Sequence, residues 1–185
     1  MPQPIRKTRR DARANRNAIL AVARDEFAAH GFEISMDRVA KAAGVGAGTL
    51  YRHFPNREAL FGVVLDGCAP QVEEEGRRLG LVNDAGRAVS EWLRIIVRWS
   101  RSFDGASAPM RDAISKEEGP LAATCADLLG TLERLLRSAQ SSGAARADMS
   151  ARDLYSAALG IAWAGEDDAA VERLLRLLEE GWRGA

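Results

Sequence analysis

Residues 35–60 read SMDRVAKAAGVGAGTLYRHFPNREAL, and this stretch decides how the sequence is interpreted. Ser35 suits the N-cap of a short helix that ends at about residue 43, and Gly44 then breaks the chain. A second short helix is predicted over residues 47–53. Two short helices joined by a glycine turn indicate a helix-turn-helix, and a preceding helix must pack across both because neither is stable alone.

The two faces of the second short helix differ in character. Leu50 and Phe54 are predicted to point into a core, where Val45 fills the space between the helices. The outer face is small and polar with one aromatic residue, and such a face lets a helix sit deep in a DNA major groove. The residues of this outer face are Gly46, Ala47, Gly48, Thr49, Tyr51 and Arg52.

Charge is distributed unevenly although the net charge of the chain is zero. Residues 1–57 carry 11 Lys and Arg against 5 Asp and Glu, whereas residues 58–185 carry 15 against 21. A basic end on an acidic protein indicates a polyanionic partner, with a solvated basic tail as the alternative. No apolar run approaches the ~20 residues of a membrane span, and Cys68 and Cys125 lack metal or redox spacing, so we expect a soluble, cytoplasmic protein.

Composition and periodicity predict an all-α fold of nine helices. We expect a flexible basic arm over residues 1–12, a helix-turn-helix DNA-binding domain over 13–55, and a ligand-binding and dimerisation domain over 56–185. The helix that follows the short pair is expected to run unbroken from residue 56 to 79. The remaining helices are expected at about residues 13–29, 83–103, 110–118, 120–141, 150–164 and 166–182.

The run GVGAGTLYRHFPNREAL, residues 44–60, resembles the signature of the tetracycline-repressor (TetR) family of bacterial transcriptional regulators. The resemblance covers residues 13–62 well, and beyond them it rests on the helical layout alone. It implies a homodimer with a three-helix DNA-binding domain and a six-helix ligand and dimerisation domain. It also implies a palindromic, double-stranded operator DNA as partner.

The resemblance assigns DNA contacts by position. Thr49, Tyr51 and His53 match the family's usual contacts, and each side chain can bond a phosphate oxygen. Arg57 matches a basic residue that clamps the DNA backbone. For Tyr51 the alternative is a core aromatic. Base readout would fall to the small residues through shape and thymine methyl groups. The complete predicted set is Ser35, Lys41, Gly46, Ala47, Gly48, Thr49, Tyr51, Arg52, His53 and Arg57, with Arg9 and Arg10 reaching a minor groove.

Large aromatic residues recur along residues 92–103 and indicate an effector pocket, with plain core packing as the alternative. A pocket of this kind favours a small, largely apolar or aromatic effector. Asp127 or Glu166 can pair with a cationic ligand, and the alternative for each is a solvated carboxylate. The residues predicted to line the pocket are Trp92, Ile96, Trp99, Phe103, Met110, Leu121, Cys125, Leu128 and Trp163.

The last two predicted helices carry apolar stripes that suit a two-fold dimer interface, although the stripes can also be buried within one chain. The predicted interface residues are Leu154, Ala158, Ile161, Val171, Leu174, Leu175 and Leu178. We therefore expect a ligand-responsive DNA-binding regulator, a repressor released by a small-molecule effector; the alternatives are an activator or a constitutive DNA binder of the same fold. The sequence has no catalytic constellation and no motif for a metal or cofactor, so an enzyme is not expected.

Overall fold

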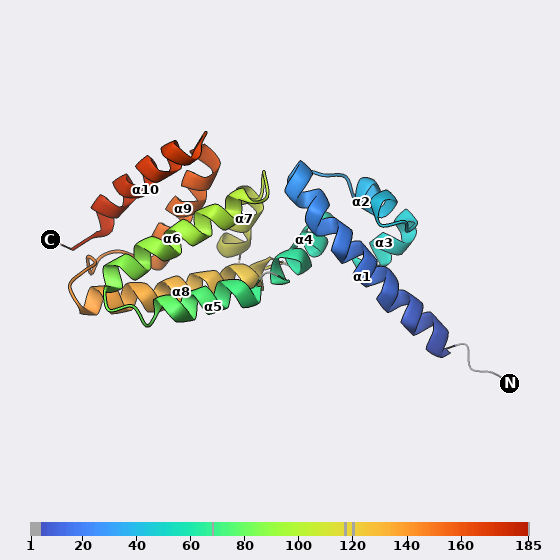
Figure 1. The fold of residues 1–185 in the computed structure, drawn as a ribbon, viewed down its shortest axis with the longest axis horizontal. Helices are drawn as coiled ribbons and strands as arrows, with labels where there is room; N and C mark the ends of the chain where they lie inside the picture. The colour runs from blue at the N-terminus through green and yellow to red at the C-terminus, as the bar shows by residue number, and fades with distance from the viewer. Residues whose placement is uncertain (1–4, 68, 117, 120, 185) are drawn as a thin grey trace.

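The computed structural model describes residues 5–67, 69–116, 118–119 and 121–184, and these ranges form an all-α protein, as predicted. The molecule is elongated, with α1–α4 at one end and α5–α10 at the other (Figure 1). None of the described helices is both long and apolar enough to cross a bilayer. Their bounds are α1 (Ile5–His30), α2 (Met36–Ala42), α3 (Ala47–His53), α4 (Arg57–Asp66), α5 (Ala69–Leu79), α6 (Ala85–Arg101), α7 (Ser107–Lys116), α8 (Ala122–Ser141), α9 (Ala151–Ala164) and α10 (Asp168–Trp182).

The first helix starts earlier than the sequence pattern indicated. We predicted a flexible arm up to residue 12, but α1 begins at Ile5 and includes residues 5–12. No glycine or proline occurs between Pro4 and Gly31, and the intervening residues are largely Ala, Arg and other good helix formers, so nothing interrupts the helix once it has begun.

The helix predicted over residues 56–79 is two helices, so the described part of the chain holds ten helices rather than nine. α4 ends at Asp66 with Gly67 as its C-cap, and α5 begins at Ala69. Pro70 has no backbone N–H to donate to the carbonyl of Asp66, which explains why the helix cannot continue unchanged through this point.

The helix-turn-helix is held together by α1, which contacts α2, α3 and α4. Ile19, Ala23 and Phe27 of α1 are fully buried, as is Leu50 of α3. The predicted cap forms: the Ser35 hydroxyl accepts a hydrogen bond from the backbone N–H of Arg38 at 3.2 Å. The side chain of Asn56 caps α4 in the same way. Gly44, between α2 and α3, has φ +66°, a conformation that favours glycine.

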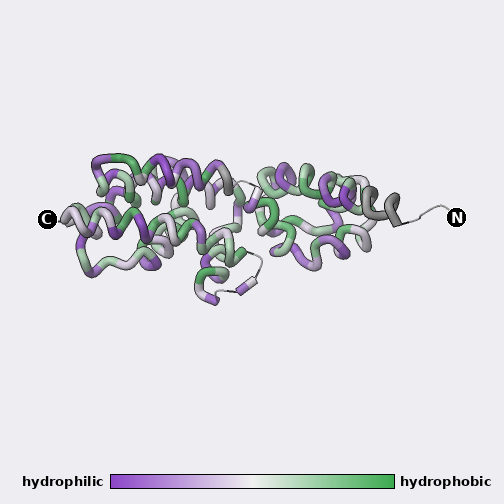
Figure 2. The backbone as a smooth tube through the Cα atoms, turned by 90° about the horizontal axis from the view of Figure 1, so that it is seen from below, coloured by the Kyte–Doolittle hydropathy of each residue, from purple (hydrophilic) through white to green (hydrophobic). Residues whose placement is uncertain are grey.

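The C-terminal part is a bundle with α6 at its centre. α6 packs against α8 and α9, and α10 covers its outer side together with α9 (Figure 1). Hydrophilic and hydrophobic residues alternate along most of these helices, which is typical of amphipathic helices that share one core (Figure 2). Trp92 of α6 is fully buried, and its indole N–H donates to the carbonyl of Leu128 at 3.2 Å.

Four phenylalanine rings join the two parts of the molecule. Phe61 of α4 lies 5.0 Å from Phe27, 5.1 Å from Phe32 and 5.3 Å from Phe103, measured between ring centroids. Beside them, the backbone N–H of Phe32 donates to the carbonyl of Asp104 at 2.6 Å. The turn between α1 and α2 is thus fixed to the loop between α6 and α7.

Gly31→Ala is expected to destabilise the protein, because Gly31 has φ +77° and an added Cβ would lie 2.8 Å from the carbonyl oxygen of Asp104. The left-handed backbone alone costs about 1–2 kcal/mol for alanine. Urea unfolding measures the change. Gly130→Ala is the control, since Gly130 is helical with open space around it and alanine there should stabilise by up to about 1 kcal/mol. Equal stability of Gly31→Ala and the unmodified protein would contradict the expectation.

Candidate functional site

The outer face of α3 collects the residues predicted to contact DNA. Leu50 points into the core, whereas Tyr51 and Arg52 are exposed. Thr49 and His53 are half-buried at the edges of the same face. The structure therefore brings the predicted residues of α3 together on one accessible surface; their contact with DNA stays a prediction.

Two glycines lie on this surface, and they differ in their structural role. Gly46 is the N-cap of α3, a position that favours glycine over alanine. Gly48 lies inside the first turn of α3, where glycine costs about 1 kcal/mol relative to alanine. A Cβ at Gly48 would meet no atom within 4 Å and its φ is not positive, so the packing and backbone of the fold do not require glycine at this residue.

The basic residues around α3 are engaged to different degrees. The Arg52 guanidinium folds back onto its own helix, donating to the carbonyl of Gly48 at 3.0 Å and to the hydroxyl of Thr49 at 3.1 Å. Lys41 of α2 is exposed and has no ion pair in the described part of the chain. Ser35 is exposed too, but its hydroxyl caps α2, which gives it a structural role.

Arg57, predicted as a DNA backbone clamp, lies at the start of α4 and is tied to the α1–α2 turn. Its guanidinium is 2.5 Å from a carboxylate oxygen of Glu33 and lies over the ring of Phe32, 5.4 Å from the centroid. A phosphate contact by Arg57 therefore requires release from Glu33. Arg9 and Arg10 fall in the first part of α1, and their side chains lie outside the described residues.

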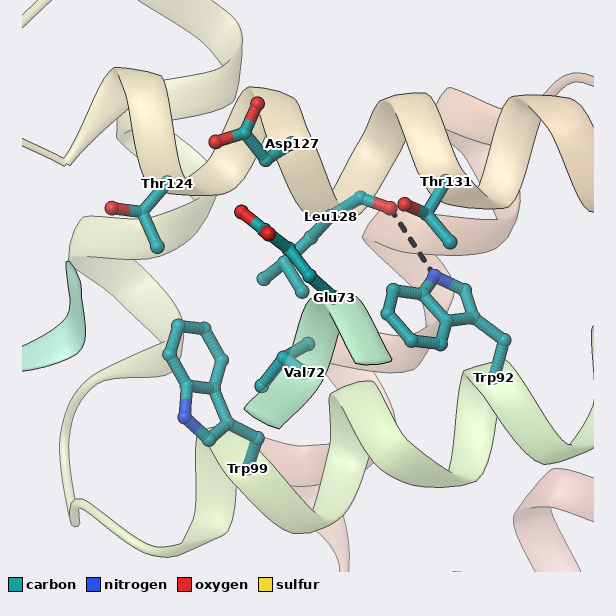
Figure 3. A pocket seen from close by; sticks show the side chains of 8 residues that line it. All are labelled: Val72, Glu73, Trp92, Trp99, Thr124, Asp127, Leu128 and Thr131. Carbon is teal, nitrogen blue, oxygen red and sulfur yellow. Dashed lines mark hydrogen bonds between the residues drawn. The ribbon is translucent and has the colours of Figure 1, made fainter. Parts of the chain in front are cut away.

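A cavity of about 20 Å³ lies between α5, α6 and α8 (Figure 3). Trp92, Trp99 and Leu128, all predicted as pocket residues, line it. The predicted residues Ile96, Phe103, Met110, Leu121 and Cys125 are buried in the core and do not line this cavity. Burial raises the pKa of the Cys125 thiol to about 11, so it stays protonated at neutral pH.

The assignment of Trp163 to the pocket was wrong. Trp163 is 81% exposed on the outer side of α9. Leu154, Ala158 and Ile161 form the buried face of this helix, and Trp163 does not lie on that face. Aromatic character alone was a poor guide to the direction in which this side chain points.

Several lining residues were not predicted. Val72 and Glu73 come from α5, and Thr124 and Thr131 come from α8. Asp127 was considered as the partner of a cationic ligand, and it does line the cavity, whereas Glu166 is exposed outside it. Only the helical spacing of Thr124, Asp127, Leu128 and Thr131 marks them as one face of a helix, and the sequence does not say what that face meets.

The stripes predicted for dimerisation are largely buried within the chain itself. Leu154, Ala158, Ile161, Val171 and Leu175 are buried, which fits the alternative that these helices cover their own bundle. Leu174 and Leu178 are half-buried. The outward faces of α9 and α10 instead carry Trp163 and Leu177, which is 65% exposed.

α2 and α3 are short helices joined by a turn at Gly44, and α1 packs against both. This arrangement defines a helix-turn-helix protein, and α5–α10 form a separate helical domain. The model of the bacterial regulatory proteins of the tetR family matches residues 19–64. The model of the SbtR-like transcriptional regulator C-terminal domain matches residues 84–184. The chain belongs to the tetR family of bacterial regulatory proteins, which confirms the predicted resemblance; it is a regulatory protein and not an enzyme.

Solved structures support the family over almost the whole chain. A TetR transcription regulatory protein from Mycobacterium vanbaalenii is 34% identical, with 95% of this chain and 99% of that one covered and a TM-score of 0.52. The TetR transcriptional regulator SCO0520 from Streptomyces coelicolor is 28% identical, with coverages of 92% and 99% and a TM-score of 0.60.

A curated relative matches a short segment of the chain. An HTH-type transcriptional regulator of Staphylococcus aureus (strain USA300) is 49% identical over 53 residues, which are 28% of this chain and 29% of the relative. The match thus spans less than a third of either protein.

Gly48→Ala should raise the free energy of unfolding and weaken DNA binding at the same time. The added methyl group should stabilise α3 by about 0.5–1 kcal/mol. The same methyl group would obstruct the close approach of a DNA groove to the α3 backbone. Urea unfolding and fluorescence anisotropy with a selected duplex measure the two effects. Gly130→Ala, on α8, should stabilise without changing DNA affinity. Unchanged affinity in Gly48→Ala would count against close approach at this residue.

Proposed function

We propose that this chain is a transcriptional repressor that binds a palindromic operator through α3 and is released by a small-molecule effector. The observation that carries the proposal is the outer face of α3, where Gly48 leaves the backbone open although neither packing nor a positive φ requires glycine there, and a partner that approaches α3 closely accounts for it. Thr49, Tyr51 and His53 lie beside the glycines and offer phosphate-bonding groups. Such a protein acts in the cytoplasm, where bacterial DNA lies.

A homodimer is part of the proposal, because helix-turn-helix proteins commonly read two half-sites about one DNA turn, ~34–36 Å, apart. The outward faces of α9 and α10 are the proposed interface because two large apolar side chains, Trp163 and Leu177, are exposed there. The exposed residues around them are largely charged and include Glu172, Arg173, Arg176 and Glu180. Burial of this surface against a second copy removes the largest exposed aromatic side chain of the described residues from water.

The effector site of the proposal is the cavity between α5, α6 and α8. The break at Gly67 means that α5 cannot act as a rigid extension of α4, so a tilt of one continuous helix is not the route. α6 offers another route: Trp99 lines the cavity, and Phe103, two residues beyond the end of α6, packs on Phe61 of α4 with 5.3 Å between the ring centroids. An effector shifts the equilibrium only as far as it prefers one arrangement of these rings.

Operator selection from random duplex DNA tests the proposal. We expect enrichment of a palindrome with half-sites about one helical turn apart, and an affinity that falls steeply with salt. Lys41→Ala should weaken binding to all sequences about equally and lower the salt slope by about 1. Failure to enrich any duplex over random competitor at moderate salt would overturn the proposal. A reporter downstream of the selected site distinguishes a repressor from an activator, and a compound screen for release distinguishes either from a constitutive binder.

Trp163→Glu should convert the dimer into a monomer, because the carboxylate would have to be buried in an apolar interface without a partner. Sedimentation velocity measures the assembly state. Leu81→Glu is the matched control: Leu81 is 86% exposed on the α5–α6 connection, where it lines a hollow together with residues of α8, and the variant should leave the dimer intact. If Trp163→Glu remains a dimer, the proposed interface is wrong and the subunits must associate through another surface.

A further inference from the structure

Two carboxylates at the rim of the cavity have no cation beside them. α5 carries three consecutive glutamates, and the second and third each pair with an arginine three residues later at 2.7 Å. Glu73, the first of the three, forms no ion pair in the described part of the chain, and neither does Asp127. Both are exposed, and Figure 3 shows their carboxylates on the same side of the cavity.

The charge of this lining sets the cavity apart from other hollows of the molecule. Its eight described lining residues include two acids and no lysine or arginine. Four other hollows on the described surface are each lined by at least one arginine: Arg134 beside α8, Arg98 between α5 and α6, Arg152 near α7, and Arg94 between α6 and α10. The tryptophan-lined cavity is therefore the one among these five whose electrostatic potential favours a cation.

The walls of the cavity are aromatic and differ in how firmly they are held. The indole N–H of Trp92 is bonded to Leu128, which fixes this ring. The indole nitrogen of Trp99 is buried and has no hydrogen-bond partner among the described residues. Trp99 is half-buried, so its ring can turn without losing a bond. Tryptophan faces attract cations more strongly than other aromatic rings do.

Space for a ligand appears when Trp99 moves. A volume of about 20 Å³ holds one water molecule. A groove of about 320 Å³ lies next to it between α5 and α6, and Val72 and Trp99 line both. Rotation of Trp99 would join the two spaces into a volume within the usual range of ligand pockets, roughly 300–1,000 Å³. The groove adds two arginines, Arg78 and Arg98, and two further acids, Glu75 and Glu91, to the lining, and Arg78 is paired with Glu75. The acids of the joined space therefore still outnumber its arginines.

We propose that the effector is an aromatic cation: its ring enters between Trp92 and Trp99, and its positive charge lies beside Glu73 and Asp127. This inference rests on the proposed function only in taking this cavity as the effector site. It narrows the apolar or aromatic effector expected from the sequence to one that carries positive charge.

The test compares two probes of the same size, the cation 1-methylquinolinium and the base 4-methylquinoline, which has the same number of carbon and nitrogen atoms and is neutral at pH 8. Calorimetry and tryptophan fluorescence quenching on the full chain without DNA report affinity. We expect the cation to bind about tenfold more tightly. The double variant Glu73→Gln, Asp127→Asn should remove this preference and leave binding of the neutral probe unchanged. Glu74→Gln, whose carboxylate pairs with Arg77, is the matched control and should keep the preference.

Trp99→Leu should lower the affinity of both probes and thereby locate them in this cavity. Equal binding of the two probes, no binding of either, or a preference that survives the double variant would overturn the inference. An equal loss in Glu74→Gln would overturn it too, because the preference would then reflect the general acidity of the domain. None of these measurements involves DNA, so the cation inference and the repressor proposal can fail separately.

Discussion

The backbone hydrogen bond from Phe32 to Asp104, with the phenylalanine rings packed beside it, is the contact on which the arrangement of the two domains depends. α2 and α3 have seven residues each, too few for independent stability, so they rely on α1 and α4. The turn that ends α1 is in turn fixed to the α6–α7 loop. The orientation of α3 is therefore set by a chain of packed rings that ends at the helix carrying both cavity tryptophans.

The helix-turn-helix could be predicted because local chemistry determines it. Ser35 and Asn56 cap the helices that follow them through hydrogen bonds to residues three positions later. Gly44 adopts the left-handed φ of +66° that the turn between α2 and α3 needs. Both features depend on neighbouring residues and not on the rest of the fold. The helix bounds that were missed depend on weaker signals. Gly67 and Pro70 were present in the sequence, but the helical periodicity on both sides masked the break. The early start of α1 was missed because its basic composition suggested a solvated arm.

Much of the candidate site could not be predicted, for a geometric reason. Apolar periodicity identifies which face of a helix is covered, as for Leu154 and Ala158, but not whether its own chain or a second copy covers it. Trp92 and Trp99 were found because their spacing forms a stripe. Glu73 and Thr124 were not predicted, because they line the same cavity only once α5 and α8 have packed beside α6. The lining of this cavity depends on how three helices pack, and the periodicity of one helix does not contain that information.

The folded-back conformation of Arg52 bears on selectivity among polyanions. In the free chain two of the five N–H donors of its guanidinium are engaged, one by the Gly48 carbonyl and one by the Thr49 hydroxyl. The other three N–H donors have no partner among the described residues, so a phosphate can bond this exposed arginine without breaking either bond. A polyanion that draws the guanidinium away from α3 must replace both bonds. A ligand that lies along α3 therefore meets the arginine already in place, whereas one that approaches from elsewhere has to displace it.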